Sequence, residues 1–370
     1  MKFRCERDLL VEALSTAGRA VTGRGGALPV LSGVKIDASN DRLEVTGSDL
    51  DLTIRTSVGV NIAESGTAVL PSRLLSDIVR SLDQGAVDLE VTGDEAQISS
   101  GRSQFAVRTL PVDDFPHLDE PSGDQVSVAA DELASGLKQV VLAASSDDAR
   151  PILTGVLMTA EEGGLRLVAT DSYRLAVRDL PEATVLGEGQ KVLVPSRALG
   201  ELIRVLGHAK EVNVRLGERD VTFFVEPEDG VSVELTTRLI EGEFPNYRQL
   251  IPASYPNEMR VGREQLLDAV RRVKLMAREA TPLRLTQRDG SLELMAVTQD
   301  VGQAHEEVDA VYSGTDELTV AFNPDFLIAG IEAATGDEVV LQTLDALKPA
   351  VMRSTEGSDY LYLLMPVRVS

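Results

Sequence analysis

Hydrophobic and polar residues alternate over many short stretches of this chain, which predicts antiparallel strands. LEVTGSDLDLTI (43–54), VDLEVTGDEAQIS (87–99) and VNVRLGERDVTFFV (212–225) place apolar side chains at every second position around polar turns, as half-buried hairpin strands do. Two stretches have helical spacing instead, ERDLLVEALSTAGRAV (6–21) and the residues after Pro71. The pattern predicts an α+β unit with two helices packed on antiparallel sheet.

The predicted helix after Pro71 has one apolar side and one basic side. At about 100° per residue, its apolar residues cluster on the face opposite Arg73 and Arg80. These apolar residues are Leu74, Leu75, Ile78, Val79 and Leu82. A proline just before the first turn suits a helix start, and Ser72 is a candidate N-cap.

The unit is repeated along the chain. LPVLSGVKI (28–36) returns as RPILTGVLM (150–158), and TGSDLDLTI (46–54) returns as ATDSYRLAV (169–177), at the same offset. VLPSRLLSDIVRSL (69–82) matches LVPSRALGELIRVL (193–206), and RTLPVDDFPHL (108–118) matches RLIEGEFPNYRQL (238–250). Four landmarks in one order indicate a duplicated domain.

A third copy is fainter. TPLRLTQRDGSLELMAVTQ (281–299) has the strand–turn–strand pattern, with Thr298 in place of the repeated aspartate, and LTVAFNPDFLIAGIEAA (318–334) has the strand, proline and helix. Turn-forming residues in LDEPSGDQ (118–125) and IPASYPNE (251–258) separate the copies. We therefore predict domains over 1–122, 123–253 and 254–370, in keeping with a chain too long for one core.

The distribution of charge is uneven. The chain carries 59 acidic and 36 basic residues and a net charge of −23, which opposes tight wrapping around a polyanion. Basic residues nevertheless recur on predicted helices, at Arg73 and Arg80, at Arg197 and Arg204, and at Arg271, Lys274 and Arg278. Such faces are either solvated surface or a lining that meets DNA phosphates without reading sequence. With no Trp and 4% aromatic residues, base stacking on a single strand is disfavoured.

No catalytic motif is present. The chain lacks a phosphate-binding loop, a dinucleotide fingerprint and a nucleophile elbow, and GRGGALP (23–29) is predicted to be a loop. Three His and the single Cys5 are too scattered for a metal cluster. Carboxylate pairs such as Asp49/Asp51, Asp113/Asp114 and Asp147/Asp148 leave a carboxylate-dependent hydrolase as a rival hypothesis. We predict no enzymatic activity, no cofactor and no metal.

Taken together, the repeats resemble one family, the bacterial sliding clamp, which is the beta subunit of the replicative DNA polymerase. The segments that carry the resemblance are LPVLSGV, SGRSQFAVRTLPVDDFP, ATDSYRLAV, VPSRAL, EGEFPNY and the terminal YLLMPVRVS, in the family's order over essentially the whole chain. The resemblance implies three clamp-type domains per chain and a head-to-tail homodimer that closes six domains into a ring. It also implies a non-catalytic processivity factor that encircles double-stranded DNA and slides along it.

The resemblance further implies a pocket that binds short linear motifs of the polymerase alpha subunit, the clamp loader and repair polymerases. Carried over by position, its residues are Leu153, Thr170, Ser172, Tyr173, Arg174 and Leu175, then Pro245, Gln249 and Leu250, and finally Asn323, Phe326, Met365, Pro366, Val367 and Arg368. Ser172 and Tyr173 replace the family's common glycine and histidine, and Gln249 replaces an arginine. By their pattern alone, Leu153 and Leu175 are better interpreted as plain core residues.

For the dimer, the family pattern points to Phe105 and Val107 of one chain against Leu275 and Met276 of the other, with acidic groups such as Glu306 and Glu307 beside them. A rival within the same fold is an interaction scaffold or paralogue that does not load on DNA. No apolar run reaches the roughly 18 residues of a membrane span, and MKFRCERDLL lacks a signal peptide's apolar stretch. We expect no membrane partner and a cytoplasmic protein.

Overall fold

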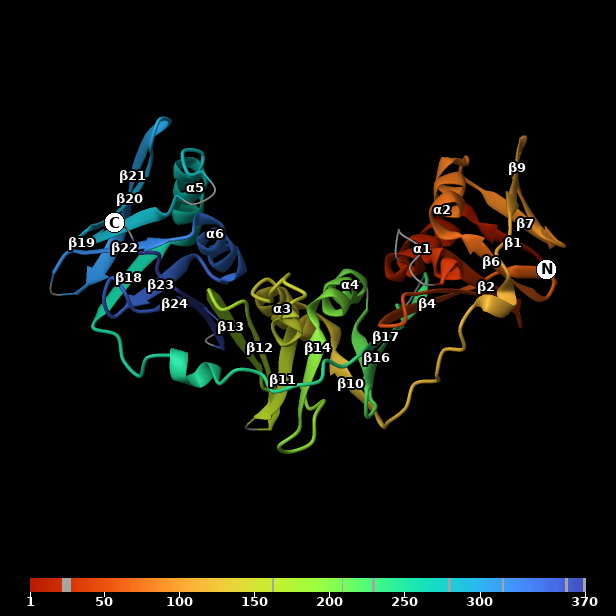
Figure 1. The fold of residues 1–370 in the computed structure, drawn as a ribbon, viewed down its shortest axis with the longest axis horizontal. Helices are drawn as coiled ribbons and strands as arrows, with labels where there is room; N and C mark the ends of the chain where they lie inside the picture. The colour runs from red at the N-terminus through yellow and green to blue at the C-terminus, as the bar shows by residue number, and fades with distance from the viewer. Residues whose placement is uncertain are drawn as a thin grey trace. The chain divides into compact units, whose positions relative to one another are not determined.

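The computed structural model describes residues 1–21, 28–161, 163–207, 209–227, 230–278, 281–314, 316–356 and 359–368. Of the loop predicted at 23–29, only Leu28 and Pro29 fall among these residues. All three copies of the repeat are α+β, as predicted, and each has two helices on antiparallel strands (Figure 1).

The first copy contains α1 (Arg7–Ala17) and α2 (Ser72–Ser81), which pack against each other. Its strands are β1 (Lys2–Glu6), β2 (Gly33–Ser39), β3 (Arg42–Ser48), β4 (Leu52–Gly59), β5 (Asn61–Glu64), β6 (Gly66–Pro71), β7 (Ala86–Thr92), β8 (Glu95–Ser100) and β9 (Ser103–Arg108). Short 3₁₀ helices occur at η1 (Gly18–Ala20), η2 (Pro29–Ser32) and η3 (Val112–Asp114).

The second copy contains α3 (Ala130–Val141) and α4 (Ser196–Leu206). Its strands are β10 (Gln125–Ala129), β11 (Gly155–Glu161), β12 (Gly164–Thr170), β13 (Arg174–Leu180), β14 (Lys191–Pro195), β15 (Glu211–Leu216), β16 (Asp220–Val225) and β17 (Ser232–Arg238). The 3₁₀ helices η4 (Pro151–Thr154) and η5 (Tyr247–Leu250) lie before β11 and after β17.

The third copy contains α5 (Arg263–Lys274) and α6 (Pro324–Ala333), again in mutual contact. Its strands are β18 (Asn257–Gly262), β19 (Leu283–Arg288), β20 (Ser291–Thr298), β21 (Gly302–Ser313), β22 (Leu318–Phe322), β23 (Glu338–Thr343), β24 (Ala350–Ser354) and β25 (Tyr360–Leu364).

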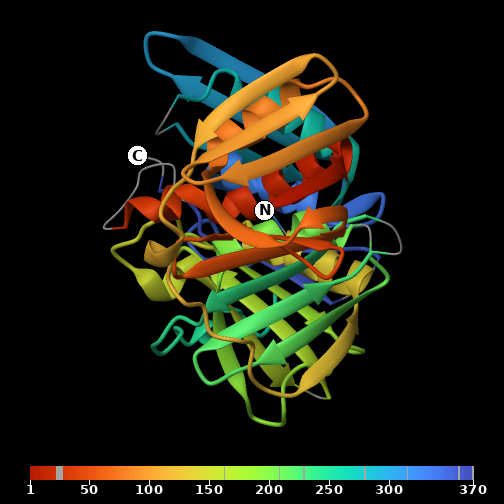
Figure 2. The same ribbon diagram turned by 90° about the vertical axis from the view of Figure 1, so that its right-hand side faces the viewer.

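Strands pair across the copies. The eight-stranded sheet runs β10-β15-β16-β17-β4-β3-β2-β6, so β17 of the second copy pairs with β4 of the first (Figure 2). The twelve-stranded sheet runs β14-β11-β12-β13-β25-β24-β23-β18-β21-β20-β19-β22, so β13 pairs with β25 of the third copy. A five-stranded sheet, β5-β1-β7-β8-β9, completes the first copy.

This pairing explains how the chain divides into compact units. Unit 1 is Met1–Ala134 with Arg197–Leu239, and unit 2 is Ser135–Ser196 with Ile240–Ser370. The division falls inside the second copy because half of its strands join each neighbour. The domain limits predicted at 122 and 253 follow the repeat, whereas the compact units follow the strand pairing.

The core of the first copy confirms most of the predicted helix faces. Leu10 and Leu14 of α1 pack with Leu75 and Val79 of α2, all with at most 1% of their surface exposed. Leu74 was predicted on the same buried face, but this is wrong, because 49% of its surface is exposed. Ser72 is not the N-cap either. Pro71 occupies that position, and no side chain caps the helix.

Candidate peptide pocket and basic helix faces

The turn between β12 and β13 is held by its own side chains. Asp171 Oδ1 accepts hydrogen bonds from the backbone N–H groups of Tyr173 (2.9 Å) and Arg174 (3.0 Å). Thr170 Oγ1 donates to the Arg174 carbonyl at 2.7 Å and accepts from Ser172 N at 3.2 Å. Ser172 has φ of +81°, the left-handed region that favours glycine. The aspartate of the repeat therefore builds a rigid turn.

Arg174 links this turn to the third copy. Its Nε donates to Asp171 Oδ2 at 3.0 Å, and its guanidinium carbon lies 4.5 Å from the centre of the Phe326 ring on α6. The Tyr173 ring stacks on the same ring at 6.4 Å between centres, with 61% of the tyrosine exposed. A paired guanidinium and two aromatic faces thus meet at one place.

The start of α6 positions Phe326. Asn323 is the N-cap, and its Oδ1 accepts from the N–H groups of Asp325 (2.8 Å) and Phe326 (3.4 Å). Burial raises the pKa of Tyr362 to about 12, so its hydroxyl stays protonated and donates to the Phe326 carbonyl at 2.9 Å. Asn323 therefore has a structural role here, fixing the helix end that carries Phe326.

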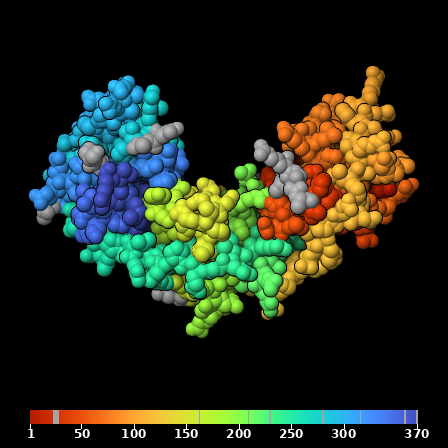
Figure 3. All heavy atoms as spheres, in the orientation of Figure 1, coloured from red at the N-terminus to blue at the C-terminus, as the bar shows by residue number. Residues whose placement is uncertain are grey.

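The C-terminal tail completes the wall. Met365 N donates to the Tyr173 carbonyl at 2.9 Å, and Val367 N donates to the Ala321 carbonyl at 2.8 Å. Met365 and Pro366 are partly buried, whereas Val367 and Arg368 are exposed. Gln139 of α3 donates to the Ala333 carbonyl at 2.8 Å. Figure 3 shows yellow and blue segments of the second and third copies side by side. The tail therefore joins the turn of the second copy to β22 of the third.

The floor beneath these groups is an apolar cluster that the sequence patterns missed in large part. Leu175 is fully buried in it, and Met365 packs against its edge. The remaining buried members are Val168, Val177, Tyr247, Val351, Leu361 and Leu363. They come from strands far apart in sequence, so only the pairing of β13 with β25 brings them together. Leu153 is 8% exposed, so for Leu153 and Leu175 a core position is correct.

The segment after β17 lies on this cluster through Tyr247, while Pro245, Gln249 and Leu250 are exposed around it. Arg248 pairs with Glu161 on β11, and Glu161 also pairs with Arg166 at 2.5 Å. The Arg248–Glu161 pair thus ties η5 to the sheet, and the Arg166–Glu161 pair joins β12 to β11. The structure places every predicted pocket residue in unit 2. The exposed Leu250, the rings of Tyr173 and Phe326, and the guanidinium groups of Arg174 and Arg368 suit a peptide with apolar and acidic side chains.

The first copy has a counterpart of this turn. Asp49 Oδ1 accepts from Asp51 N (3.1 Å) and Leu52 N (2.8 Å), and Leu50 has φ of +79°. Asp49 Oδ2, however, accepts from Arg197 at the start of α4. No aromatic ring stacks there among the described residues.

The basic helix faces differ in their ion pairs. On α4, Arg197 pairs with Asp49, and Arg204 lies 3.6 Å from Glu201, which Arg19 also approaches at 3.7 Å. On α5, Arg271 pairs with Glu332 at 2.6 Å and Lys274 pairs with Asp325. Within the described ranges, Arg73 and Arg80 of α2 form no ion pair.

The third copy corrects one expectation. Arg271, Lys274 and Arg278 were predicted on one helix face, but α5 ends at Lys274 and Arg278 follows it. Moreover, Asp325 and Glu332 of α6 stand at the positions that hold arginines in α2 and α4. A signal for this was available, because these two acids have the same spacing of seven residues as Arg73 and Arg80.

The predicted dimer residues lie on two separate elements. Phe105 is 37% exposed on the edge strand β9, whereas Val107 is 5% exposed and belongs to the first-copy core. Leu275 is 83% exposed after α5, and Met276 is partly buried. Val297 (50%) and Val301 (40%) are exposed on the neighbouring β20–β21 hairpin, where Thr298 bonds the Met276 carbonyl. Glu306 pairs with Arg272 at 2.6 Å, which lowers the pKa of its carboxyl.

Among the described residues, no group of three or more His, Cys, Asp or Glu side chains is placed to hold a metal ion. None of the described helices is long and apolar enough to span a membrane.

Comparison with known proteins gives the class of this fold. Models of the DNA polymerase III beta subunit match residues 1–119 (N-terminal domain), 127–246 (central domain) and 248–368 (C-terminal domain). The beta sliding clamp of Streptomyces coelicolor is 35% identical over 384 residues, and that of Bacillus subtilis 31% over 386, with both chains fully covered.

Solved structures agree. The sliding clamp of Bacillus subtilis superposes with a TM-score of 0.90 at 30% identity, and the clamp of Bartonella birtlesii, bound to griselimycin, with 0.92 at 32%, each covering 100% of both chains. The chain belongs to the beta sliding clamp family, the beta subunits of DNA polymerase III.

Proposed function

We propose that this protein is the processivity factor of a replicative DNA polymerase, a non-catalytic ring that encircles duplex DNA and tethers its partners. Family membership supports the function, and the strand pairing supports the ring. β4 of the first copy pairs with β17, the last strand of the second copy, and β13 of the second pairs with β25, the last strand of the third.

In both pairings the last strand of one copy pairs with a strand of the copy before it. Two strand edges remain that could pair in the same way, one in the first copy and one in the third. In the described part of the chain, β9, the last strand of the first copy, pairs only with β8, and residues 302–309 of β21 pair only with β20. β21 of one chain can therefore pair with β9 of a second, and the second can do the same in return. Two chains joined head to tail close a six-domain ring, because the heterologous contact returns on itself. Phe105 and Leu275 lie beside these edges.

The function rests on topology, so the decisive measurement is retention. Loaded protein should remain far longer on a covalently closed circle than on a short linear duplex with free ends, in a gel-filtration assay. Equal retention on both would refute the ring.

The dimer contact is tested separately. Leu275→Ala with Met276→Ala removes apolar surface worth about 25 cal/mol per Å², whereas exposed ion pairs contribute only about 0–1 kcal/mol. The double variant should sediment as a monomer at concentrations where the unchanged chain is a dimer. Glu307→Gln is the control and should stay dimeric. A dimer of the double variant would contradict the proposed contact.

The pocket in unit 2 is where we place the short linear motifs of the polymerase alpha subunit, the clamp loader and repair polymerases. Its aromatic and guanidinium groups support this, and griselimycin is bound by the clamp of Bartonella birtlesii. The DNA-facing surface is the set of basic helix faces. Neutralising Arg73, Arg80, Arg197 and Arg204 together should abolish stimulation of processive synthesis, whereas an interaction scaffold that is not loaded on DNA would be unaffected. The cytoplasm is the compartment that fits this work.

A further inference from the structure

Helix α6, which carries Phe326 in its first turn, is held by the second copy at both of its ends. At the N-terminal end, the Phe326 ring meets Tyr173 and Arg174. At the C-terminal end, Gln139 Nε2 of α3 donates to the Ala333 carbonyl at 2.8 Å. All of these residues belong to unit 2. The position of α6 therefore depends on contacts with the second copy at two separate points.

Between its ends, α6 lies directly on Tyr362 of β25. Gly330 allows this close contact, because a Cβ at that position would come within 2.4 Å of two carbons of the Tyr362 ring. The Tyr362 hydroxyl also donates to the Phe326 carbonyl at 2.9 Å. The helix has 10 residues and is about 15 Å long at 1.5 Å per residue. A shift of its last turn about this contact would therefore move Phe326 at the other end.

The last turn of α6 lies over a polar seam between α3 and the strands below it. α6 begins beside Arg174 and crosses Tyr362 at its middle. Its last turn and Gln139 therefore lie at the level of Tyr360, two residues earlier on β25. Arg178 is the cross-strand partner of Tyr360, on the same face of the sheet. The Tyr360 hydroxyl, Arg178 Nε and Gln139 Oε1 are all buried and have no hydrogen-bond partner among the described residues.

This seam explains why a buried glutamine stands here. Buried polar groups are nearly always hydrogen-bonded, so water completes the three groups. A buried amide with one bond to protein and one to water adds little net stability, and an apolar side chain of similar volume would pack as well. Gln139, which is 4% exposed, therefore fixes the position of the Ala333 carbonyl more than it stabilises the core.

We propose that Gln139 is a positioning residue for the peptide pocket. By holding the last turn of α6, it keeps the Phe326 ring against Tyr173 and Arg174, where the peptide binds. The inference rests on the proposed function, since it concerns the pocket that receives the short linear motifs. It adds a residue outside the pocket, on α3, to those that set the affinity for these motifs.

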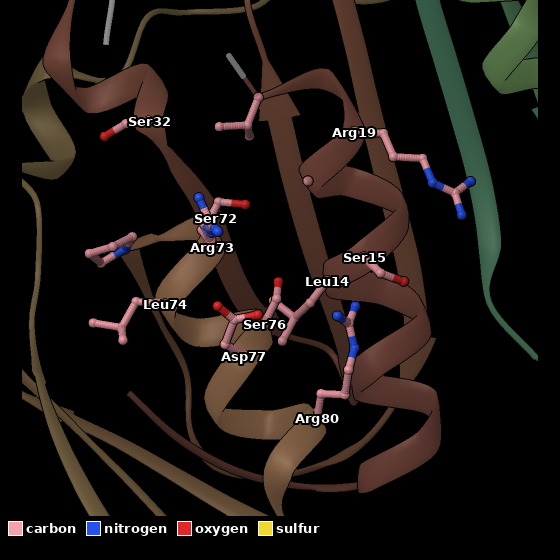
Figure 4. Close-up of a pocket in the computed structure, with 13 residues that line it drawn as sticks. Leu14, Ser15, Arg19, Ser32, Ser72, Arg73, Leu74, Ser76, Asp77 and Arg80 are labelled. Atoms are coloured by element: carbon pink, nitrogen blue, oxygen red, sulfur yellow. The ribbon is translucent and has the colours of Figure 1, made fainter. Parts of the chain in front are cut away.

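The boundary between the first and second copies offers a matched comparison. The corresponding helices there are α1 and α4, and the residues that link them lie in unit 1. Arg19, just after α1, points away from the hollow between α1 and α2 (Figure 4) and lies 3.7 Å from Glu201 of α4. This pair also links helices of two copies, but it is far in sequence and structure from Phe326. Arg19→Met is therefore the control variant.

The test is calorimetry on the full chain with a synthetic peptide carrying the clamp-binding segment of the polymerase alpha subunit. Gln139→Met keeps the length of the side chain but cannot donate to the Ala333 carbonyl, and it should weaken peptide binding about fivefold. Arg19→Met should change the affinity less than twofold. Unchanged affinity in Gln139→Met, or equal losses in both variants, would overturn the proposal.

A double-mutant cycle separates positioning from a general loss of structure. In the Phe326→Ala background, Gln139→Met should cause less than a twofold further loss, because the ring that it positions is gone. A fivefold loss in both backgrounds would show that Gln139 does not act through Phe326, and the proposal would fail while the pocket stands. If the unchanged chain binds neither the peptide nor griselimycin, the assignment of the pocket in the proposed function fails as well.

Discussion

The turns at Asp49 and Asp171 have the same backbone hydrogen bonds, but their aspartates pair with different arginines. In each, the aspartate Oδ1 accepts two backbone N–H groups, and the next residue has φ near +80° (+79° at Leu50, +81° at Ser172). The second carboxylate oxygen differs, because Asp49 binds Arg197 of α4 in the next copy whereas Asp171 binds Arg174 of its own turn.

The helix of the next copy that lies at each turn explains the difference. Where α4 presents Arg197, α6 presents Asp325, which pairs with Lys274 instead of reaching the turn. The second turn therefore has to supply its own cation, and Arg174 then extends over Phe326. With the arginine on the turn and not on the helix, Arg174 and Phe326 meet at the second turn and have no counterpart at the first, so we propose one peptide site per chain.

The largest expected difference between the two turns comes from removing each aspartate. Asp171→Ala leaves two partly buried N–H groups and the 16% exposed Arg174 side chain without their acceptor, and should lower the free energy of unfolding by about 2–3 kcal/mol. Asp49→Ala also removes the acceptor of two N–H groups, one of them exposed, but Arg197 is 53% exposed and can rehydrate, so the cost should be smaller, about 1 kcal/mol. Urea denaturation measures both.

Asparagine at each site is the matched control, because it keeps the Oδ1 acceptor of the two N–H groups and replaces the Oδ2 acceptor of the arginine with an amide NH2. Asp171→Asn should recover a smaller part of the loss than Asp49→Asn does. Equal costs at the two sites would mean that the turns are energetically the same.

The pocket itself is tested at the equivalent positions Phe326 and Leu74. Phe326→Ala removes the ring under Arg174 and Tyr173, interactions worth about 0.5–2 kcal/mol. Affinity for a polymerase-derived peptide should fall roughly tenfold in calorimetry. Leu74→Ala should leave it unchanged, and a loss there as large as at Phe326 would place the peptide elsewhere.

The smallest effect concerns the left-handed residues. Glycine adopts positive φ without cost, so Ser172→Gly and Leu50→Gly should each raise the free energy of unfolding by about 0.5 kcal/mol, net of added unfolded-state entropy. Ser172→Gly also loses the bond from Arg150 Nη1 (3.2 Å) and should gain less than Leu50→Gly. Thermal unfolding compares them, and destabilisation of both would show that the side chains outweigh the backbone strain.

Most of this fold could be predicted from the sequence, because the repeated segments can be compared with one another within the chain. The strand–helix order and the buried positions Leu10, Leu14 and Leu75 follow from local periodicity. Leu74 is an exception to this periodicity, because it lines a hollow between α1 and α2. A helical wheel does not show which part of a helix surface the neighbouring helix leaves uncovered.

The site was harder to foresee. Tyr173, Arg174 and Phe326 followed from the family resemblance, but their mutual contacts depend on strand pairing between copies. Val351 and Leu363 were missed for that reason, since each reads alone as an ordinary strand residue. The acids of α6 were visible in the sequence, yet their partners on α5 are set by helix packing.

The pairing of β17 with β4 and of β13 with β25 also determines how a fragment of the chain would behave. A fragment cut at the repeat limits, holding the second copy alone, would expose both β13 and β17 as bare edges. Bare edges recruit strands from other molecules. Such a fragment should precipitate or form fibres, and keeping it in solution would require charged or proline substitutions along both seams.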